Sequence, residues 1–548
     1  MIQAKLRTLL AEAVEELRRL GVIPDGVTAP IDLQRPARPQ HGDFSTNLAL
    51  VLSGKLGTPP RTLAERILEA LPEADWVARA TVAGPGFINF FLTHAWLQET
   101  LRDIARLREA FGRSDEGEDV KVLVEFVSAN PTGPLHVGTG RNAAYGDALA
   151  RLLEVTAHAV EREYYINDTG RQIDLFAESL QARYLQALGK DAQVPEDGYR
   201  GAYLVELGGR LAAERGERLV GRLDDIRAWG LEQALAGIGA TLERFGVRFD
   251  TWFSEQSLHD SGRLDAAVAR LADAGLTFEQ DGAVWFRSTG FGDSRDRVLV
   301  RSDGRPTYLT SDIAYLIDKA TRGFDHAVYI LGADHHGAVA SLQAAAQALE
   351  LPIVVEILVY QLVTLRSGGE EVRMSKRTGD IVTLDELLDE VGTDAARFTF
   401  LLRSVDGTLD FDLDLVKAKS QENPVYYVQY AYARICSILR TAADQGVVLG
   451  PVEEAPLDEL SHETEQTLAR MLSEYPETVM VAARVRGPHR LTAYTRDLAA
   501  AFHAFYRDCR VISDDAGLTQ ARLWLAEATR QVLANALAIL GVSAPEKM

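Results

Sequence analysis

The 548-residue chain contains only two cysteines, Cys436 and Cys509. Two cysteines can neither build a disulfide framework nor complete a four-ligand zinc site by themselves, so a reducing compartment is the simplest interpretation. The chain also lacks a run of roughly 18 apolar residues, which argues against a membrane-spanning helix. Acidic residues interrupt the apolar stretch of residues 1–21, which is not typical of a signal peptide. We therefore expect a cytoplasmic protein that does not enter a membrane.

Glycine and proline, with 44 and 19 residues, lie far below the content of disordered or collagen-like chains, so the composition excludes both. Hydrophobic residues make up 47% and charged residues 25%, as in an ordinary globular protein. Acidic side chains outnumber basic ones by 79 to 58, and the net charge of −21 argues against a surface that coats nucleic acid throughout. It does not argue against a local basic patch. At about 150 residues per domain, the length predicts three or four domains.

The sequence pattern divides the chain into an N-terminal α+β module, a parallel-sheet domain and a C-terminal helical bundle. The first part combines helical spacing with strand-like pieces around Gly84-Pro85-Gly86. The second opens with a strand, a loop of small residues and a helix. It later shows a strand–helix–strand pattern over 326–360, which is typical of a doubly wound, Rossmann-like nucleotide-binding fold. The predicted boundaries of this multidomain α/β protein are 1–105, 106–390 with a helical insertion at about 170–290, and 391–548 for the all-α bundle.

A loop of small residues between a predicted strand and a predicted helix is the first candidate site. It runs from Ser128 to Arg141 and exposes backbone N–H groups at a helix N-terminus, where the helix dipole favours an anion. Gly138 and Gly140 allow the backbone to approach a ligand closely, and His136 places a hydrogen-bond donor beside the anion site. A flexible turn is an equally good interpretation of this segment by itself.

A short basic loop over residues 372–380 is the second candidate site. It contains three cations and two hydroxyl groups, and it follows Gly368 and Gly369 closely. Such a loop can close over a polyphosphate, stabilise the charge of a transition state and release pyrophosphate. Considered alone, the segment would more simply be a solvated basic turn.

Together, the two segments resemble the signature sequences of class I aminoacyl-tRNA synthetases, His-Ile-Gly-His and Lys-Met-Ser-Lys-Ser. They stand here, in the family's order, as His136-Val137-Gly138-Thr139 and Arg373-Met374-Ser375-Lys376-Arg377. The resemblance implies that His136 and Lys376 are catalytic, with His136 on an ATP phosphate and Lys376 stabilising the activation transition state. The ATP contacts that it implies are His136, Gly138, Thr139, Arg373, Met374, Ser375 and Lys376.

Two positions depart from the family signatures. Thr139 replaces the second histidine and keeps a hydroxyl donor, whereas Arg373 replaces the first lysine and keeps the charge. Some members that lack the second-signature lysine carry a compensating lysine just before the first signature. That position is Gly133 here, which agrees with the retention of Lys376.

Other stretches resemble bacterial-type arginyl-tRNA synthetases in particular: VEFVSANPTGPLHVG, EYYINDTGRQ, YLTSD, GADHHG and the ending LGVSAP. The resemblance implies that Asp312 and Tyr308 hold the guanidinium of arginine. The residues that it implies for the ammonium and carboxylate are Glu125, Ser128 and Asn130, with the Asp334–His336 segment, including His336, completing the pocket.

The residue types suit arginine as a substrate. A guanidinium is a planar fork of five donors that prefers carboxylate acceptors, and Asp312 and Tyr308 would share one face of a helix or turn. Without the resemblance, Asp312 would more simply be a helix N-cap or a surface acid. Glu125 is different, because an acid inside an apolar strand needs a partner or a function.

The resembling family binds the tRNA anticodon with its C-terminal bundle. Thr393-Asp394-Ala395-Ala396-Arg397 matches the motif that gives that family's anticodon-binding domain its name. Tyr426, Tyr430 and Arg434 fall at i, i+4 and i+8 and would share one helix face, where rings stack on bases and arginine neutralises phosphate. The two tyrosines would equally well be core residues.

Further tRNA contacts are expected near both ends of the chain. By resemblance, Phe87 and Asn89 of the N-terminal module contact the tRNA elbow; a place in the turn and strand core is the alternative, above all for Phe87. The stretch 481–512 has six arginines and two aspartates, which suggests a phosphate-contacting surface. The net charges of 1–105 and 391–548 are −1 and −5, so the predicted tRNA-binding parts are less acidic than the middle.

The resemblance implies arginine, tRNA(Arg) and ATP with Mg²⁺ as substrates, and adenylate formation that requires bound tRNA. We expect a monomer without a protein-bound zinc ion, since the neighbours His335 and His336 would point to opposite faces of a strand. Three alternatives remain open. These are a class I synthetase for another amino acid, a nucleotidyltransferase that uses a similar His-x-Gly-His loop, and a catalytically inactive tRNA-binding paralogue, suggested by Thr139.

Overall fold

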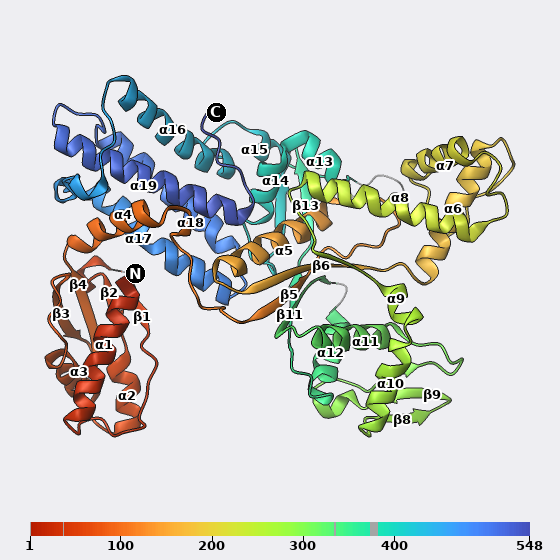
Figure 1. Ribbon diagram of the computed structural model, residues 1–548, viewed down its shortest axis with the longest axis horizontal. Coiled ribbons are helices and arrows are strands. Elements are labelled where there is room, and N and C mark those ends of the chain that lie inside the picture. The colour runs from red at the N-terminus through yellow and green to blue at the C-terminus, as the bar shows by residue number, and fades with distance from the viewer. Residues whose placement is uncertain (1, 37, 334–335, 373–381) are drawn as a thin grey trace.

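The computed structural model describes residues 2–36, 38–333, 336–372 and 382–548. A central parallel sheet lies between an N-terminal module, a bundle of long C-terminal helices and a helical lobe formed by α6, α7 and α8 (Figure 1). Within the described residues, we find no helix with the length and apolar character needed to cross a membrane.

The N-terminal module is an antiparallel sheet packed against helices, as the sequence predicts. Its strands lie in the order β1-β2-β4-β3, and Gly84-Pro85-Gly86 forms the turn between β3 and β4. Phe44, Ile88 and Phe90 are fully buried in its core. The elements are α1 (Ile2–Arg19), β1 (Leu33–Gln34), β2 (Phe44–Thr46), α2 (Leu48–Leu56), α3 (Pro60–Glu69), β3 (Val77–Ala83) and β4 (Phe87–Leu92). The next helix, α4 (Ala95–Leu107), lies against the C-terminal helices rather than in this module (Figure 1).

A five-stranded sheet in the order β12-β11-β5-β6-β7 forms the central domain, and all neighbouring strands are parallel. Val122 and Val124 pack in the core cluster that contains α5, whereas Leu123 packs with α11 and α12. Helices therefore cover both faces, and the predicted strand–helix–strand unit at 326–360 is confirmed. The elements are β5 (Lys121–Glu125), α5 (Val137–Val155), β6 (Ala159–Ile166), β7 (Thr251–Ser254), α11 (Tyr308–Thr321), β11 (His326–Gly332), α12 (His336–Ala348) and β12 (Val354–Tyr360).

The segment between β6 and β7 forms the helical lobe, which has a small core of its own around Phe176, Leu204 and Ile226. β7 lies inside the range of about 170–290 that the sequence predicts as one helical insertion, so an edge strand of the main sheet divides that insertion. Four residues are too few to give a sequence pattern. The elements are α6 (Arg171–Ala187), α7 (Ala202–Arg215), α8 (Leu223–Arg244), and, after β7, α9 (Glu255–Asp260), α10 (Arg263–Asp273) and the antiparallel strands β8 (Thr277–Gln280), β9 (Ala283–Phe286) and β10 (Arg297–Val300).

The chain after β12 forms a small sheet and several short helices. β13 pairs with β14 and, in parallel, with β15, which lies beyond the predicted domain boundary at 390 and remains attached to the central domain. The helix predicted from 384 to 402 is broken at Gly392, whose φ of +78° separates α13 from α14. The elements are β13 (Val363–Ser367), β14 (Glu370–Glu371), α13 (Leu384–Val391), α14 (Thr393–Phe400), β15 (Leu409–Asp412) and α15 (Leu413–Lys417).

The C-terminal bundle is all-helical, as predicted. One of its helices, α17, continues through Pro476, where the sequence pattern predicts an end. Ion pairs of Arg35 with Glu474 (3.1 Å) and of Asp43 with Arg470 (3.6 Å) attach the N-terminal module to α17. The helices are α16 (Pro424–Asp444), α17 (Glu463–Arg484), α18 (His489–Asp508) and α19 (Ala516–Leu540).

Candidate active site

The first signature segment begins helix α5. His136 is the N-cap, and its Nδ1 accepts a hydrogen bond from the backbone N–H of Thr139 at 3.2 Å. The Thr139 hydroxyl lies 3.2 Å from Nε2 of the same ring, and Thr139 is buried, so it supports the His136 ring. Gly138 is half-buried beside that ring. Gly140 does not face a ligand as expected: a Cβ added there would lie 2.7 Å from Leu384, so its role is helix packing.

The described chain resumes after the second signature segment at Val382, which lies beside the first signature segment. The backbone N–H of Val137 donates to the Val382 carbonyl at 3.4 Å, and His136 forms an isolated antiparallel bridge with Thr383. Val382 and Thr383, which follow the predicted basic loop in the chain, are therefore held at the start of α5. The loop residues predicted to contact ATP lie outside the described residues: Arg373, Met374, Ser375 and Lys376.

A cluster of acidic side chains surrounds the N-terminal end of α11. Tyr308 is the first residue of this helix and Asp312 follows one turn later, so both lie on one face, as their spacing predicts. Burial raises the pKa of Asp312 to about 7, and the nearby carboxylates of Glu125 and Glu255 add to the shift. Tyr308 is 67% exposed, which leaves its ring and hydroxyl available to a ligand.

Glu255 is a member of this cluster that the sequence analysis missed. It is the first residue of the short helix α9, it is buried, and it accepts hydrogen bonds from Ser311 and Thr169. Burial is the main cause of its raised pKa, and those hydrogen bonds oppose the shift. No local pattern marks this residue, because only the fold brings it near Asp312.

Glu125, the last residue of β5, forms a buried ion pair with Lys319 of α11. The Lys319 Nζ also lies 3.9 and 3.8 Å from the ring centroids of Tyr315 and Tyr329. Burial raises the pKa of Glu125 and lowers that of Lys319, and the ion pair opposes both shifts. Any contact of Glu125 with a substrate ammonium must therefore coexist with this internal cation.

The loop after β5 carries Ser128 and Asn130. Ser128 Oγ accepts a hydrogen bond from the backbone N–H of Tyr165 at 3.1 Å. Burial raises the pKa of Tyr165, and the charges of the acidic cluster raise it further, which shows that Tyr165 lies near the cluster. Because Ser128 bonds Tyr165, the loop borders the cluster as well. Asn130 Nδ2 donates to Gln172 of α6 at 2.5 Å. His336 begins α12, but its side chain lies outside what the structure describes.

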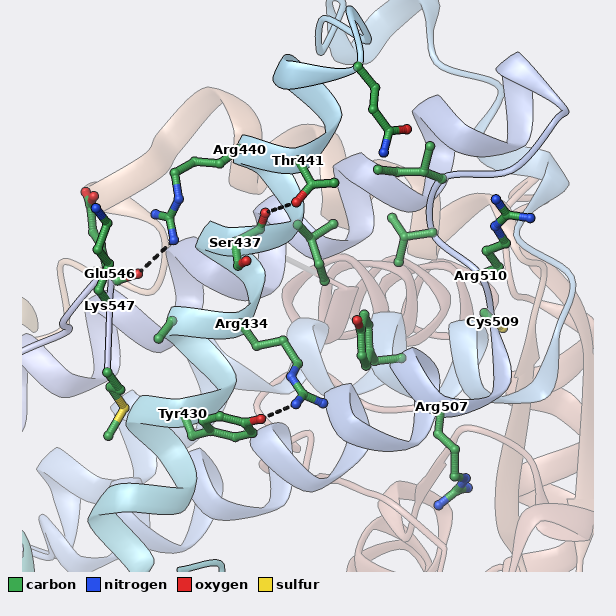
Figure 2. A pocket seen from close by; sticks show the side chains of 17 residues that line it. Tyr430, Arg434, Ser437, Arg440, Thr441, Arg507, Cys509, Arg510, Glu546 and Lys547 are labelled. Carbon is green, nitrogen blue, oxygen red and sulfur yellow. Dashed lines mark hydrogen bonds between the residues drawn. The ribbon is translucent and has the colours of Figure 1, made fainter. Parts of the chain in front are cut away.

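A basic groove of about 940 Å³ lies on the bundle, between α16, the end of α18 and the last residues of the chain (Figure 2). The Arg434 guanidinium lies 4.5 and 4.9 Å from the ring centroids of Tyr430 and Tyr506. Tyr426 stacks on Tyr430 at 6.0 Å and 9°, and both rings are half-buried rather than core. The charged residues that line the groove are five cations and one acid: Arg434, Arg440, Arg507, Arg510, Lys547 and Glu546.

The arginines of segment 481–512 do not form one continuous surface. Arg484 and Arg486 form ion pairs with acids of the central domain, whereas Arg507 and Arg510 line the groove at the other end of α18. A helix of 20 residues is about 30 Å long. Only the second pair can therefore contact a ligand in the groove.

Phe87 and Asn89 lie on strand β4 of the N-terminal module. Phe87 is 38% exposed at the start of the strand, whereas Asn89 is buried between Ser45 and Thr81 of the neighbouring strands. The sequence favours Phe87 as the core residue of the two, and the structure reverses this. Phe87 can touch a ligand directly.

The last feature of the site is the arrangement of side chains that could bind a metal ion. Within it, no group of three or more His, Cys, Asp or Glu side chains is arranged to hold a metal ion. Cys436 and Cys509 are free, buried thiols.

The parallel sheet, the first signature segment at the start of α5, the second signature sequence and the helical bundle define a class I aminoacyl-tRNA synthetase. The sequence matches the family model "tRNA synthetases class I (R), catalytic domain" over residues 104–400. It also matches "Arginyl tRNA synthetase N terminal domain" over 4–92 and "DALR anticodon binding domain" over 428–548. The chain belongs to the arginine–tRNA ligase family.

Similar proteins agree with this assignment along the whole chain. The arginine–tRNA ligase of Heliobacterium modesticaldum is 48% identical, with 100% of this chain and 99% of that protein covered. The arginine–tRNA ligase of Moorella thermoacetica is 49% identical, with 99% and 98% covered. The solved structure of Thermus thermophilus arginyl-tRNA synthetase covers 100% of both chains with a TM-score of 0.79 and 26% identity.

Proposed function

We propose that the chain activates arginine with ATP, forming arginyl-adenylate and pyrophosphate, and then transfers the arginine to the 3′ end of tRNA(Arg). The observation that carries this proposal is made at the start of α5, where the first signature segment contacts Val382 and Thr383, which follow the second signature segment in the chain. The loop before α5 borders the acidic cluster around Asp312. A helix N-terminus suited to phosphate, next to carboxylates suited to a cationic amino acid, matches arginine activation.

In the proposed amino-acid site, Asp312 and Glu255 bind the guanidinium and Tyr308 lies against it. A guanidinium has five donors in a planar fork and is matched best by more than one acceptor. Burial is the main cause of the raised pKa of both acids, and Glu255 adds to the shift of the Asp312 pKa. A bound cation would favour the ionised form of each. The residues proposed for the ammonium and carboxylate are Glu125, Ser128, Asn130 and His336.

In the proposed ATP site, His136 and Gly138 contact phosphate at the start of α5. Thr139 holds the His136 ring, as their hydrogen bonds suggest. Mg²⁺ would enter with ATP on the phosphate oxygens and keep several water ligands, so a cage of protein ligands is not required. The second signature would close over the phosphates through Arg373, Met374, Ser375 and Lys376.

The proposed anticodon site is the basic groove of Figure 2. Half-buried tyrosine rings offer stacking surfaces for unpaired bases, and the five cations of the groove suit the phosphates between them. Tyr426, Tyr430 and Arg434 are the contacts that we propose there. In the N-terminal module, Phe87 is the proposed contact with the tRNA elbow, and Asn89 would act from within the sheet.

Arg434→Gln is expected to weaken tRNA binding by about tenfold and to reduce the slope of log affinity against log salt by about one. The substitution removes the positively charged guanidinium that lies over the rings of Tyr430 and Tyr506 in the groove. The KM for arginine should not change. Filter binding of tRNA at several salt concentrations measures the effect. Arg484→Gln, at an arginine paired with Glu116, is the control, and an equal loss in both variants would contradict the assignment.

We also propose that adenylate formation requires bound tRNA. The bundle and the active-site helix α5 are joined by the buried ion pair of Arg397 and Asp147, which gives the two sites a direct structural connection. Arginine-dependent exchange of pyrophosphate into ATP should therefore occur only when tRNA is present. Exchange at full rate without tRNA would refute this part of the proposal.

Lys376→Ala is expected to reduce tRNA charging by at least about a hundredfold while tRNA still binds, because it removes a cation from the activation transition state. Charging and tRNA binding are measured on the same preparation. An inactive paralogue would instead show no change in function. Such a result would reinstate that alternative.

We propose that one chain, acting as a monomer in the cytoplasm, is the functional unit, with parts at 1–105, 106–390 and 391–548. The ion pairs between the N-terminal module and α17 support a single connected body. Sedimentation during turnover tests the monomer, and activity confined to a larger species would contradict it.

A further inference from the structure

A strained turn follows strand β5. Val127 has a φ of +66° and Ser128 a φ of +41°, so two consecutive non-glycine residues lie in the left-handed region. This region is unfavourable for a β-branched residue such as valine, because its side chain crowds the backbone. Strain of this kind persists only where the surrounding structure holds the backbone in place.

Asn142 holds this turn from the opposite side. It lies on α5, three residues after Thr139 at the end of the first signature, and it is 2% exposed. Its Oδ1 accepts a hydrogen bond from the backbone N–H of Val127 at 2.9 Å, and its Nδ2 donates to the Ile330 carbonyl of β11 at 2.9 Å. One amide therefore connects the helix of the first signature, the strained turn and a neighbouring strand.

The strained turn sets the position of the proposed contacts for the arginine ammonium and carboxylate. Ser128 lies in the turn, and Asn130 follows two residues later. The Tyr164 hydroxyl donates to the Ala129 carbonyl at 2.7 Å, which fixes the loop at one point beyond the turn. If Val127 relaxed to a negative φ, the chain direction at Ser128 would change. Ser128 Oγ would then lose the hydrogen bond that it accepts from the Tyr165 N–H.

We propose that Asn142 is a positioning residue for amino-acid activation: it holds Val127 in the left-handed conformation and thereby aligns Ser128 and Asn130 with the substrate. Asn142 does not touch arginine or ATP in this arrangement. The inference rests on the proposed arginine site and assigns a structural cause to its geometry. Neither the signature residues nor the acidic cluster includes this side chain.

The test combines removal of the Asn142 amide with relief of the strain. Asn142→Ala and Asn142→Leu both remove the acceptor for the Val127 N–H, and leucine also fills the space of asparagine. Each is expected to raise the KM for arginine and to lower kcat, together reducing kcat/KM by about a hundredfold, because displacement of a reacting group by about 1 Å costs this much. The KM for tRNA should not change.

Val127→Gly is then added to each Asn142 variant. Glycine adopts a positive φ without steric cost, so the turn no longer needs the Asn142 amide, and kcat/KM for arginine should recover by about tenfold or more. Val127→Gly alone completes the double-mutant cycle. A purely structural role of Asn142 in the core predicts no recovery, because glycine at 127 restores no packing.

Asn535→Ala is the matched control. Asn535 is also a buried asparagine whose Nδ2 bonds backbone carbonyls, those of Arg108 and Phe111, far from the acidic cluster. It should lower the thermal unfolding midpoint without changing the KM for arginine. Unchanged arginine kinetics in folded Asn142 variants, or no recovery with Val127→Gly in either background, would overturn the inference. Normal activity of Asp312→Asn would instead overturn the proposed arginine site, so the two failures are distinguishable.

Discussion

Replacing Asp312 with asparagine is expected to lower kcat/KM for arginine by about a thousandfold, as when one charge of a buried, hydrogen-bonded pair is lost. The substitution keeps the shape of the side chain and removes the charge that faces the guanidinium. Glu255 would remain as a single carboxylate, which cannot satisfy the five donors of the fork. The kinetics of tRNA charging at varied arginine concentration measure the loss.

Asp303→Asn provides the control for this prediction. Asp303 lies earlier in the same segment, is exposed, and bonds the Arg305 guanidinium at 2.8 Å. The same chemical change at this position should leave arginine charging unaffected. Charging by Asp312→Asn within about tenfold of the unsubstituted protein would contradict the guanidinium assignment.

The pH dependence of arginine binding follows from the same residue. With a pKa of about 7, the Asp312 carboxyl is about half protonated at neutral pH, and arginine would bind the ionised form. The KM for arginine should therefore fall as the pH rises through about 7, and Asp312→Asn should remove this dependence. Because its folded-state pKa is raised, the protonated carboxyl stabilises the arginine-free fold at low pH. That contribution is lost as the pH approaches about 7.

Arg397→Met is expected to lower the free energy of unfolding by about 3 kcal/mol, since it removes the fully buried partner of Asp147. That carboxylate is left with Arg151 (2.9 Å) and the more distant Arg162 (3.7 Å). Arg397 is fully buried between α5 and the bundle. It forms an ion pair with Asp147 and donates hydrogen bonds to the carbonyls of Leu540 and Phe245. Urea unfolding measures the loss, with a separate probe of the bundle to detect unfolding of one part alone.

Two further variants test the cause of this loss. Arg366→Met, at an exposed arginine paired with Asp410, should leave the urea midpoint nearly unchanged. Adding Asp147→Leu to Arg397→Met should recover part of the stability, because the buried carboxylate that has lost its buried cation is gone. If the double variant is instead less stable than Arg397→Met, by as much as a second core substitution would cost alone, the buried charge is not the cause of the loss.

The elements predicted best from the sequence are those with long, regular patterns. The strand–helix–strand unit at 326–360 and the bundle helices are confirmed because periodicity over many residues determines them. The ends are less predictable. Pro476 suggests a helix end, yet tertiary packing carries α17 through it, and Gly392 breaks a stretch with continuous helical spacing.

The candidate site was predicted from local sequence motifs. The site residues that were not predicted are those that only the fold brings next to these motifs. The pairing of Tyr308 with Asp312 follows from helical spacing, and the structure confirms that they share a face. Glu255 lies far from Asp312 in the chain, and Lys319, although it follows Asp312 on α11, meets Glu125 of β5 only through the fold. Thr139 illustrates the other limit: its bond to His136 depends on the side-chain geometry of the helix start.

Charging of tRNA with labelled amino acids tests the central claim most directly. Arginine, lysine and glutamine are each supplied with ATP, Mg²⁺ and tRNA to the full-length protein. We predict that arginine alone is attached efficiently, because two carboxylates match a guanidinium fork better than an ammonium or an amide. Equal or preferred attachment of lysine or glutamine, or no attachment of arginine by folded protein that binds tRNA, would contradict the account.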